Sequence, residues 1–200
     1  MNQAVFSSLY ASLKINNVQL LPLQTEHEHA LINVCKDGQL WELDYTSVPH
    51  YSQIKAYIAK ALELKSQGLR VPFAVLDQTT GQIVGTTSFR DFVWDARRVE
   101  IGYTWYAKSA QRTHINTSCK LLLLSYAFET LQANSVVLRT DIRNVKSQKA
   151  IERLGAHRDG ILRQDAMRKD GTVRDTVIYS IVKDEWQTIQ QHLTSLIIHS

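Results

Sequence analysis

The chain has 200 residues, the length of one globular domain, because domains usually run to about 100–200 residues. Hydrophobic residues make up 44% of the sequence and charged residues 21%, a composition that excludes a disordered chain, a coiled coil and a collagen-like fibre. A net charge of +4 is too small by itself to indicate a nucleic-acid-binding protein. We therefore expect residues 1–200 to form a single domain.

The positive charge is concentrated in one part of the chain. Residues 1–97 carry a net charge of −1, residues 98–174 of +7 and residues 175–200 of −2. An excess of this size attracts anions, and phosphate groups are the obvious candidates. The alternative is that these side chains only form a solvated surface.

Cysteine usage and hydropathy favour a cytoplasmic protein. Cys35 and Cys119 are far apart and form no metal-ligand pattern, so we expect neither a disulfide framework nor a metal site. The first twenty residues lack the pattern of a signal peptide. The longest apolar clusters, such as residues 121–124, are far shorter than the roughly 20 residues that cross a bilayer. We therefore expect a reduced compartment and no membrane partner.

The first half of the chain predicts two helices followed by antiparallel strands. Thr25 and Glu28 have the spacing of a capping box, which predicts a first helix from about residue 26. Apolar residues at helical spacing predict a second helix over residues 51–67, with Gly68 as its stop signal. Short β-rich runs predict strands at residues 71–76 and 83–89, with a turn at 79–82, and then a third strand.

This third strand contains four large residues that alternate along the chain, namely Val99, Ile101, Tyr103 and Trp105. Alternate residues of a strand point to the same side of a sheet. We therefore expect these four side chains to face the core together, with Glu100, Gly102 and Thr104 on the opposite face.

The second half predicts a mixed sheet. A helix over residues 117–132 connects the third strand to a strand at 136–140, which indicates a parallel right-handed crossover. The remaining predicted elements are a short helix that Asn144 caps and Gly155 ends, a hairpin of strands 161–167 and 173–182 around Asp170-Gly171, and a helix after Asp184. The order predicts an α+β fold, and the absence of G-x-G-x-x-G argues against a dinucleotide-binding fold.

Residues 98–120 form the segment that is richest in chemistry. They read RVEIGYTWYAKSAQRTHINTSCK, a strand that leads through a polar loop into a helix. The start of a helix offers free backbone N–H groups and the positive end of the helix dipole, which together can bind an anion. Every crossover helix has this geometry, so the pattern alone is weak.

This segment resembles the acyl-CoA-binding core of the GNAT superfamily of N-acetyltransferases, in which a strand precedes Q/R-x-x-G-x-G/A at a helix start. Residues 111–116, QRTHIN, fall on that pattern, with His114 and Asn116 in place of the two small residues. The order of the later elements is similar to the ribosomal-protein N-terminal acetyltransferase subgroup, and the likeness covers about residues 18–186. It implies a mixed, mostly antiparallel sheet of six to seven strands, with helices on both faces and a central splayed parallel strand pair.

The resemblance also implies where acetyl-CoA binds. Backbone N–H groups freed by the splay would bind the pantetheine arm and polarise the thioester carbonyl, and the helix start would bind the pyrophosphate. The implied cofactor-binding residues are Ile101, Gly102, Tyr103, Thr104, Gln111, Arg112, Thr113, His114, Ile115, Asn116, Thr117 and Asn144. For His114 two interpretations stand: a protonated ring assists the amides, or the loop has lost its function and the ring lies on the surface.

Two residues are candidates for catalysis. Glu100, near the expected gap between strands, could take a proton from the substrate ammonium through water, or it could be an exposed carboxylate paired with Arg98 or Arg90. The general-acid tyrosine that is common in the family falls on Ile151, which cannot donate a proton. The resemblance then suggests Ser147 as the acid, although a serine there could simply satisfy a backbone amide.

The resemblance predicts an N-acetyltransferase that moves an acetyl group from acetyl-CoA directly to a primary amine, either a protein N-terminus or a small amine. The alternative, suggested by the departures at 114 and 151, is a non-catalytic acyl-CoA-binding or sensing domain. We expect no nucleic-acid partner, because a dense basic run and a recognition-helix motif are both missing. A homodimer is a further expectation, since self-association is common in this family.

Overall fold

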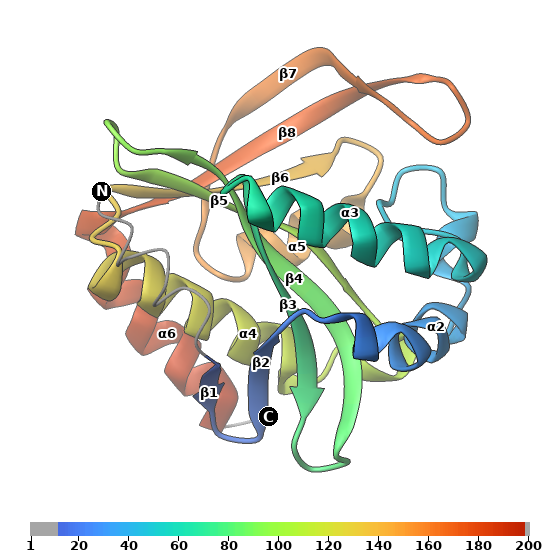
Figure 1. The fold of residues 1–200 in the computed structure, drawn as a ribbon. Coiled ribbons are helices and arrows are strands. Elements are labelled where there is room, and N and C mark those ends of the chain that lie inside the picture. Colours follow the sequence, from blue (N-terminus) through green and yellow to red (C-terminus); the bar gives the residue numbers. More distant parts are fainter. Residues whose placement is uncertain (1–11, 199–200) are drawn as a thin grey trace.

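The computed structural model describes residues 12–198, and its central feature is an eight-stranded sheet (Figure 1). The strand order is β1-β2-β3-β4-β5-β6-β8-β7, and all neighbours are antiparallel except β5 and β6. The strands are β1 (Leu13–Ile15), β2 (Val18–Pro22), β3 (Arg70–Asp77), β4 (Gln82–Val93), β5 (Arg98–Tyr106), β6 (Ser135–Asp141), β7 (His157–Met167) and β8 (Val173–Val182). The predicted mixed sheet is confirmed, and the short edge strand β1 brings it to eight strands.

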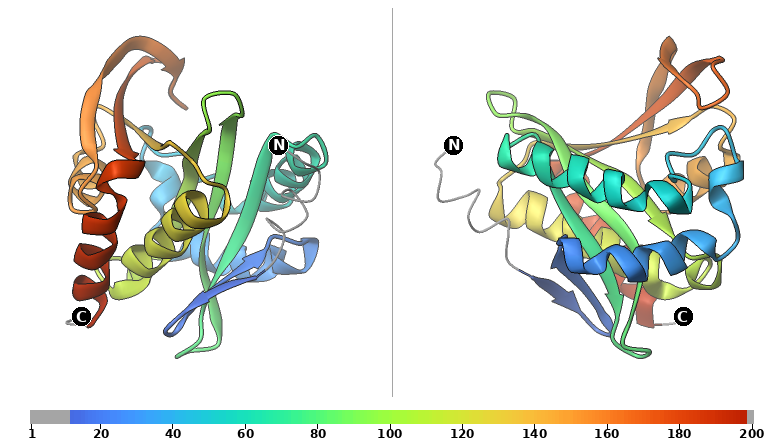
Figure 2. Two further views of the ribbon diagram at one scale, coloured as in Figure 1. Left: turned by 90° about the vertical axis from the view of Figure 1, so that its left-hand side faces the viewer. Right: turned by 45° about the vertical axis from the view of Figure 1, so that its right-hand side comes forward.

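Helices cover both faces of this sheet. The views in Figure 2 place α2 and α3 on one face and the packed pair α4 and α6 on the other. The helical segments are η1 (Thr25–His27), α2 (Glu28–Lys36), η2 (Leu40–Glu42), η3 (Tyr51–Gln53), α3 (Ile54–Ser66), η4 (Lys108–Ala110), α4 (His114–Ser125), η5 (Tyr126–Thr130), α5 (Val145–Glu152), η6 (Lys183–Glu185) and α6 (Trp186–Ile198). None of the helices within residues 12–198 is long and apolar enough to cross a membrane.

The predicted elements agree with the structure in type and order. The first helical segment starts one residue earlier than expected, with Gln24 rather than Thr25 as its N-cap. The long crossover helix begins at His114 and ends in a π-helical turn, η5. Gly155 follows α5 with a φ of +92°, which an L side chain rarely adopts, so the predicted stop signal is confirmed.

The parallel pair β5 and β6 is joined over a very short length. Only residues 98–100 of β5 pair with residues 135–137 of β6. Beyond Glu100 the two strands separate, so the splayed parallel pair is confirmed. Within residues 12–198, backbone groups of β5 after this point have no partner strand on the β6 side, and this gap is the structural basis of the candidate site.

A β-bulge in β5 corrects the prediction that four alternating residues share one face. Ser88 of β4 pairs with Gly102 and Thr86 pairs with Trp105, so β5 contains one extra residue. Tyr103 in the bulge has a φ of +50°. Alternation is reversed beyond the bulge: the Thr104 hydroxyl meets Lys120 of α4, whereas the Trp105 ring contacts Tyr57 of α3.

Candidate active site

The loop before α4 ends in a capped helix start. Thr113 is the N-cap, and its hydroxyl accepts a hydrogen bond from the Ile115 amide at 3.3 Å and donates one to the Ala110 carbonyl at 2.7 Å. Arg112 has a φ of +62°, so the left-handed residue of this turn is Arg112. His114 is the first residue of the helix and does not need the freedom of a glycine. The substitution at 114 therefore leaves the backbone of an anion-binding helix start in place.

The polar loop residues fall into two groups. Arg112 and Thr113 are exposed, and Asn116 is half-buried. By contrast, Ile115 is buried in the core, and the buried Thr117 hydroxyl accepts a hydrogen bond at 2.7 Å from Arg153, which follows α5. The first group can therefore contact a ligand directly, and the second group holds α4 in place.

The histidine and glutamine of the loop are directed into the protein. Nε2 of His114 is buried and has no hydrogen-bond partner within the described residues, so the interpretation that places this ring on the surface is wrong. The Gln111 side chain donates to the Tyr106 carbonyl at 3.4 Å. The anion donors at this helix start are therefore main-chain amides, because first-turn N–H groups have no intrahelical acceptor.

Glu100 lies at the point where β5 and β6 separate, and it is only 5% exposed. Its carboxylate oxygens are 3.8 Å from Nε of Arg90 and 3.1 Å from Nε of Arg139. Burial raises the pKa of Glu100 to about 7 despite both arginines. The alternative of an exposed carboxylate is therefore wrong, although the predicted contact with Arg90 is present. A carboxylate with this pKa can accept a proton near neutral pH.

Arg139 is a site residue that sequence analysis missed. It lies on β6, two residues beyond the last pair with β5, and its side chain reaches Glu100 across the gap. The available signal was register: in a parallel pair, the partner of Glu100 is Val137, and Arg139 shares the face of that residue.

Lys120 of α4 is a second residue that the sequence did not reveal. It is 5% exposed, and its Nζ donates to the Thr104 hydroxyl at 3.0 Å, which in turn lies 2.8 Å from the Thr87 hydroxyl. Burial lowers the pKa of Lys120 to about 8. The ammonium stands on the α4 side of β5, directly after the bulge.

We expect Lys120→Met to stabilise the protein at pH 7. The charged form of a buried lysine is penalised below its folded pKa, and the penalty disappears as pH rises through the ordinary value near 10.5. The shift corresponds to a gain of at most about 3 kcal/mol, reduced by the lost hydrogen bond to Thr104. Urea unfolding at pH 7 and pH 10 measures the gain, which should shrink at the higher pH. Lys149→Met, at an exposed position of α5, is the control; a Lys120→Met protein less stable than wild type at pH 7 would contradict the assignment.

The start of α5 brings Asn144 and Ser147 together. The Asn144 side-chain oxygen accepts a hydrogen bond from the Ser147 amide at 3.1 Å, so the predicted capping by Asn144 is confirmed. Ser147 is half-buried in the first turn of the helix. Ile151, one turn further, is buried in the core and offers no proton donor.

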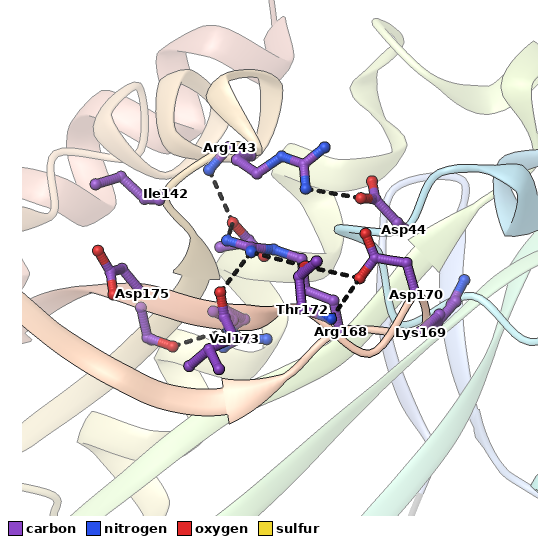
Figure 3. Close-up of polar contacts among 12 residues, drawn as sticks. Asp44, Ile142, Arg143, Arg168, Lys169, Asp170, Thr172, Val173 and Asp175 are labelled. Carbon is purple, nitrogen blue, oxygen red and sulfur yellow. Dashed lines mark hydrogen bonds and ion pairs between the residues drawn. The ribbon is translucent and has the colours of Figure 1, made fainter.

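The far end of the gap is closed by the β7–β8 hairpin. Asp141 at the end of β6 accepts hydrogen bonds from Nε and Nη2 of Arg168, at 2.7 and 3.1 Å, and from the Arg143 amide at 2.8 Å (Figure 3). Burial alone would raise the pKa of Asp141, but these hydrogen bonds hold it below its usual value. Lys169, next in the chain, donates to the Val48 carbonyl at 2.6 Å. The hairpin is therefore fixed to both β6 and the segment before α3.

Comparison with known proteins agrees with this geometry. The family model described as "Acetyltransferase (GNAT) domain" matches residues 17–157, more than half of the chain. The chain therefore belongs to the GNAT acetyltransferase family.

Particular relatives make the relationship more specific. Over 107 residues the chain is 36% identical to "Putative ribosomal N-acetyltransferase YdaF" of Bacillus subtilis (strain 168), a match to 54% of this chain and 57% of that protein. The chain thus spans little more than half the length of this relative. A crystal structure of an acetyltransferase from T. thermophilus has a TM-score of 0.82 and 30% identity, with 93% of this chain and 96% of that one covered.

A third match shares the fold at lower identity. Mycobacterium smegmatis RimJ, solved in complex with CoA-disulfide, is 18% identical with a TM-score of 0.76 and 93% coverage of both chains. The resemblance to acetyltransferases of ribosomal proteins that the sequence suggested is confirmed by relatives with these names.

Proposed function

We propose that this chain transfers an acetyl group from acetyl-CoA directly to a primary amine, without a covalent enzyme intermediate. The observation that carries the proposal is the buried Glu100, which stands where β5 and β6 separate. The anion-binding start of α4 follows the same strand, so a nucleotide site and a proton acceptor share one sheet gap.

The residues around the gap suit acetyl-CoA. Main-chain amides of His114 and Asn116, with the exposed Arg112 and Thr113, would hold the pyrophosphate. The amides of residues 101–104, around the bulge, would bind the pantetheine arm and polarise the thioester carbonyl as negative charge develops on its oxygen. When bound, acetyl-CoA supplies the activated acyl group.

Glu100 would act as the general base. A protonated amine has no lone pair for attack, so its proton must leave before or during bond formation. A carboxylate whose pKa is about 7 can accept this proton, directly or through water, and remain effective near neutral pH. Arg90 and Arg139 hold the carboxylate in position from β4 and β6.

Ser147 would protonate the leaving thiolate, since the family's tyrosine position is occupied by Ile151. We expect Ser147→Ala to lower kcat by about tenfold or more while KM for acetyl-CoA changes little, because only the departing sulfur would use the hydroxyl. Steady-state kinetics provide the measurement, and Ser147→Thr is the control that keeps a hydroxyl. An unchanged kcat in Ser147→Ala would leave Ser147 with its helix-capping role alone.

The experiment that tests the function has two stages. Calorimetry with acetyl-CoA should show binding that CoA displaces, and the ligand should raise the melting temperature by linkage. A screen of peptides and small amines should then show acetylated product and free CoA. No heat with acetyl-CoA and no competition by CoA would refute the proposal.

A second candidate is a non-catalytic acyl-CoA sensor, which the buried Ile151 at the proton-donor position favours. It predicts binding of acetyl-CoA without turnover of any amine in the screen. Turnover that is lost in Glu100→Gln would exclude it.

A further inference from the structure

An open pocket of about 560 Å³ lies on the α3 side of β5, next to Glu100. Its wall contains four arginines from four strands and one acidic residue, with Tyr103 of the bulge among them: the charged members are Arg70, Arg90, Arg98, Arg139 and Asp91. Because Tyr103 and Arg139 come from the two strands that separate, the pocket adjoins the gap itself.

Arg70 is the most unusual of these residues because it is buried without a carboxylate. It is 2% exposed, and its Nε and Nη2 donate to the Ser88 and Tyr57 hydroxyls at 2.9 and 2.8 Å. Its guanidinium carbon lies 3.9 Å from the centre of the Tyr103 ring. No carboxylate of residues 12–198 forms an ion pair with it. A buried cation normally has an anionic partner, because an unpaired one is strongly destabilising.

The other charges do not balance the pocket. Arg90 pairs with Asp91 at 3.1 Å and shares Glu100 with Arg139. Arg98 is exposed at the rim and has no ion pair in the described part of the chain. Four guanidinium groups therefore face two carboxylates, and protonation of Glu100 increases the excess of positive charge.

Resting on the acetyl transfer proposed above, we propose that the acceptor is an amine that also carries a carboxylate, and that Arg70 and Arg98 bind this carboxylate while the amine faces Glu100. A guanidinium binds a carboxylate through two parallel hydrogen bonds, and Arg70 is already oriented by Ser88 and Tyr57. An acceptor with only positive charges, such as a polyamine, is repelled by the same wall.

The positive wall also assists the chemistry. Nearby cations disfavour the ammonium form and lower the pKa of the bound amine, so the neutral nucleophile is more populated. The carboxylate of the acceptor provides the attraction that the ammonium lacks. Binding and deprotonation are thus divided between two groups of one substrate.

The test is a comparison of matched acceptors with acetyl-CoA held constant. One arm uses peptides with the N-terminal sequence Ala-Asp-Glu, Ala-Asn-Gln or Ala-Lys-Lys, and the other uses alanine against alaninamide. We expect kcat/KM for the charged member to exceed that for its neutral amide by about tenfold or more in at least one arm. The arm that shows the preference identifies an acidic peptide or a free amino acid as the source of the carboxylate. The preference should weaken with added salt.

Variants assign the preference to the pocket. Arg98→Gln and Arg70→Gln should each reduce the acidic-to-neutral ratio, and Arg98, being exposed, remains informative if Arg70→Gln does not fold. Arg163→Gln, at an exposed position of β7 outside the pocket, removes the same charge and should keep the ratio.

Three outcomes oppose the inference in distinguishable ways. Equal rates with acidic and neutral acceptors, or faster rates with Ala-Lys-Lys, overturn it and leave acetyl transfer standing. A preference that survives both pocket variants overturns the assignment to Arg70 and Arg98. Binding of acetyl-CoA with no product from any acceptor overturns the proposed transfer, and the inference with it.

Discussion

Replacing Glu100 with glutamine is expected to lower kcat/KM for the amine by about 10²–10⁴-fold, the usual contribution of general acid–base catalysis. The amide has the shape of the carboxylate but cannot accept the proton of the ammonium. Binding of acetyl-CoA should persist, because its contacts are assigned to the amides of β5 and to the start of α4. Initial rates with a fixed acetyl-CoA concentration provide the measurement.

The pH dependence separates a catalytic role of Glu100 from a structural one. Its pKa is raised to about 7, so the wild-type rate should fall as pH drops through 7, and Glu100→Gln should lack this limb. The raised pKa also means that ionisation opposes folding: wild-type stability decreases as pH rises from about 4.5 to 7. Glu100→Gln escapes this loss, which is at most about 3 kcal/mol, so it should be at least as stable as wild type at pH 8. An inactive variant that is also unstable would point to a structural role.

Replacing Asp141 with alanine should lower the free energy of unfolding by about 3 kcal/mol, because it leaves Arg168 without its carboxylate. The Asp141 side chain is fully buried and also accepts the Arg143 amide, so two further donors lose their acceptor. For a chain of this length the melting temperature should fall by roughly 10 °C. Thermal unfolding followed by circular dichroism measures this change.

The matched control is Asp165→Ala, an exposed aspartate on β7, which should leave the melting temperature nearly unchanged. Acid provides a second check. The pKa of Asp141 is held below its usual value, so its stabilising contribution is complete above about pH 4 and is lost as pH falls further. The difference between wild type and Asp141→Ala should therefore narrow in acid. Equal stabilities at pH 7 would show that this ion pair does not hold the hairpin.

The order of elements was predictable because each element carries a local signal. The capping by Asn144, the stop at Gly155 and the turn at Asp170-Gly171 depend on residues close in sequence, and the structure has an element boundary or turn at each of them. The bulge at Tyr103 was not predictable. Alternation along β5 gives no indication of the extra residue, which is visible only in its pairing with β4.

The candidate site shows the same division. Glu100 was identified because a charged residue interrupts an apolar strand, but its burial depends on Arg139, which is 39 residues away on a parallel neighbour. Lys120 resembles any helical lysine in sequence, and only the packing of α4 on β5 gives it a pKa of about 8. Arg70 was overlooked for a similar reason, since its contacts come from α3, β4 and β5.

The three paired residues between β5 and β6 have a mechanical consequence. Among the described residues they are the only strand pairing that joins β1–β5 to β6–β8, so the sheet consists of two half-sheets connected at one short hinge. Ladder hydrogen bonds resist rotation in proportion to their number, and here few of them oppose a change in the angle between the halves. Glu100 stands at this hinge and contacts one arginine from each half-sheet. Its ionisation is thus coupled to the width of the gap, and hydrogen exchange at residues 98–100 and 135–137 would report both at once.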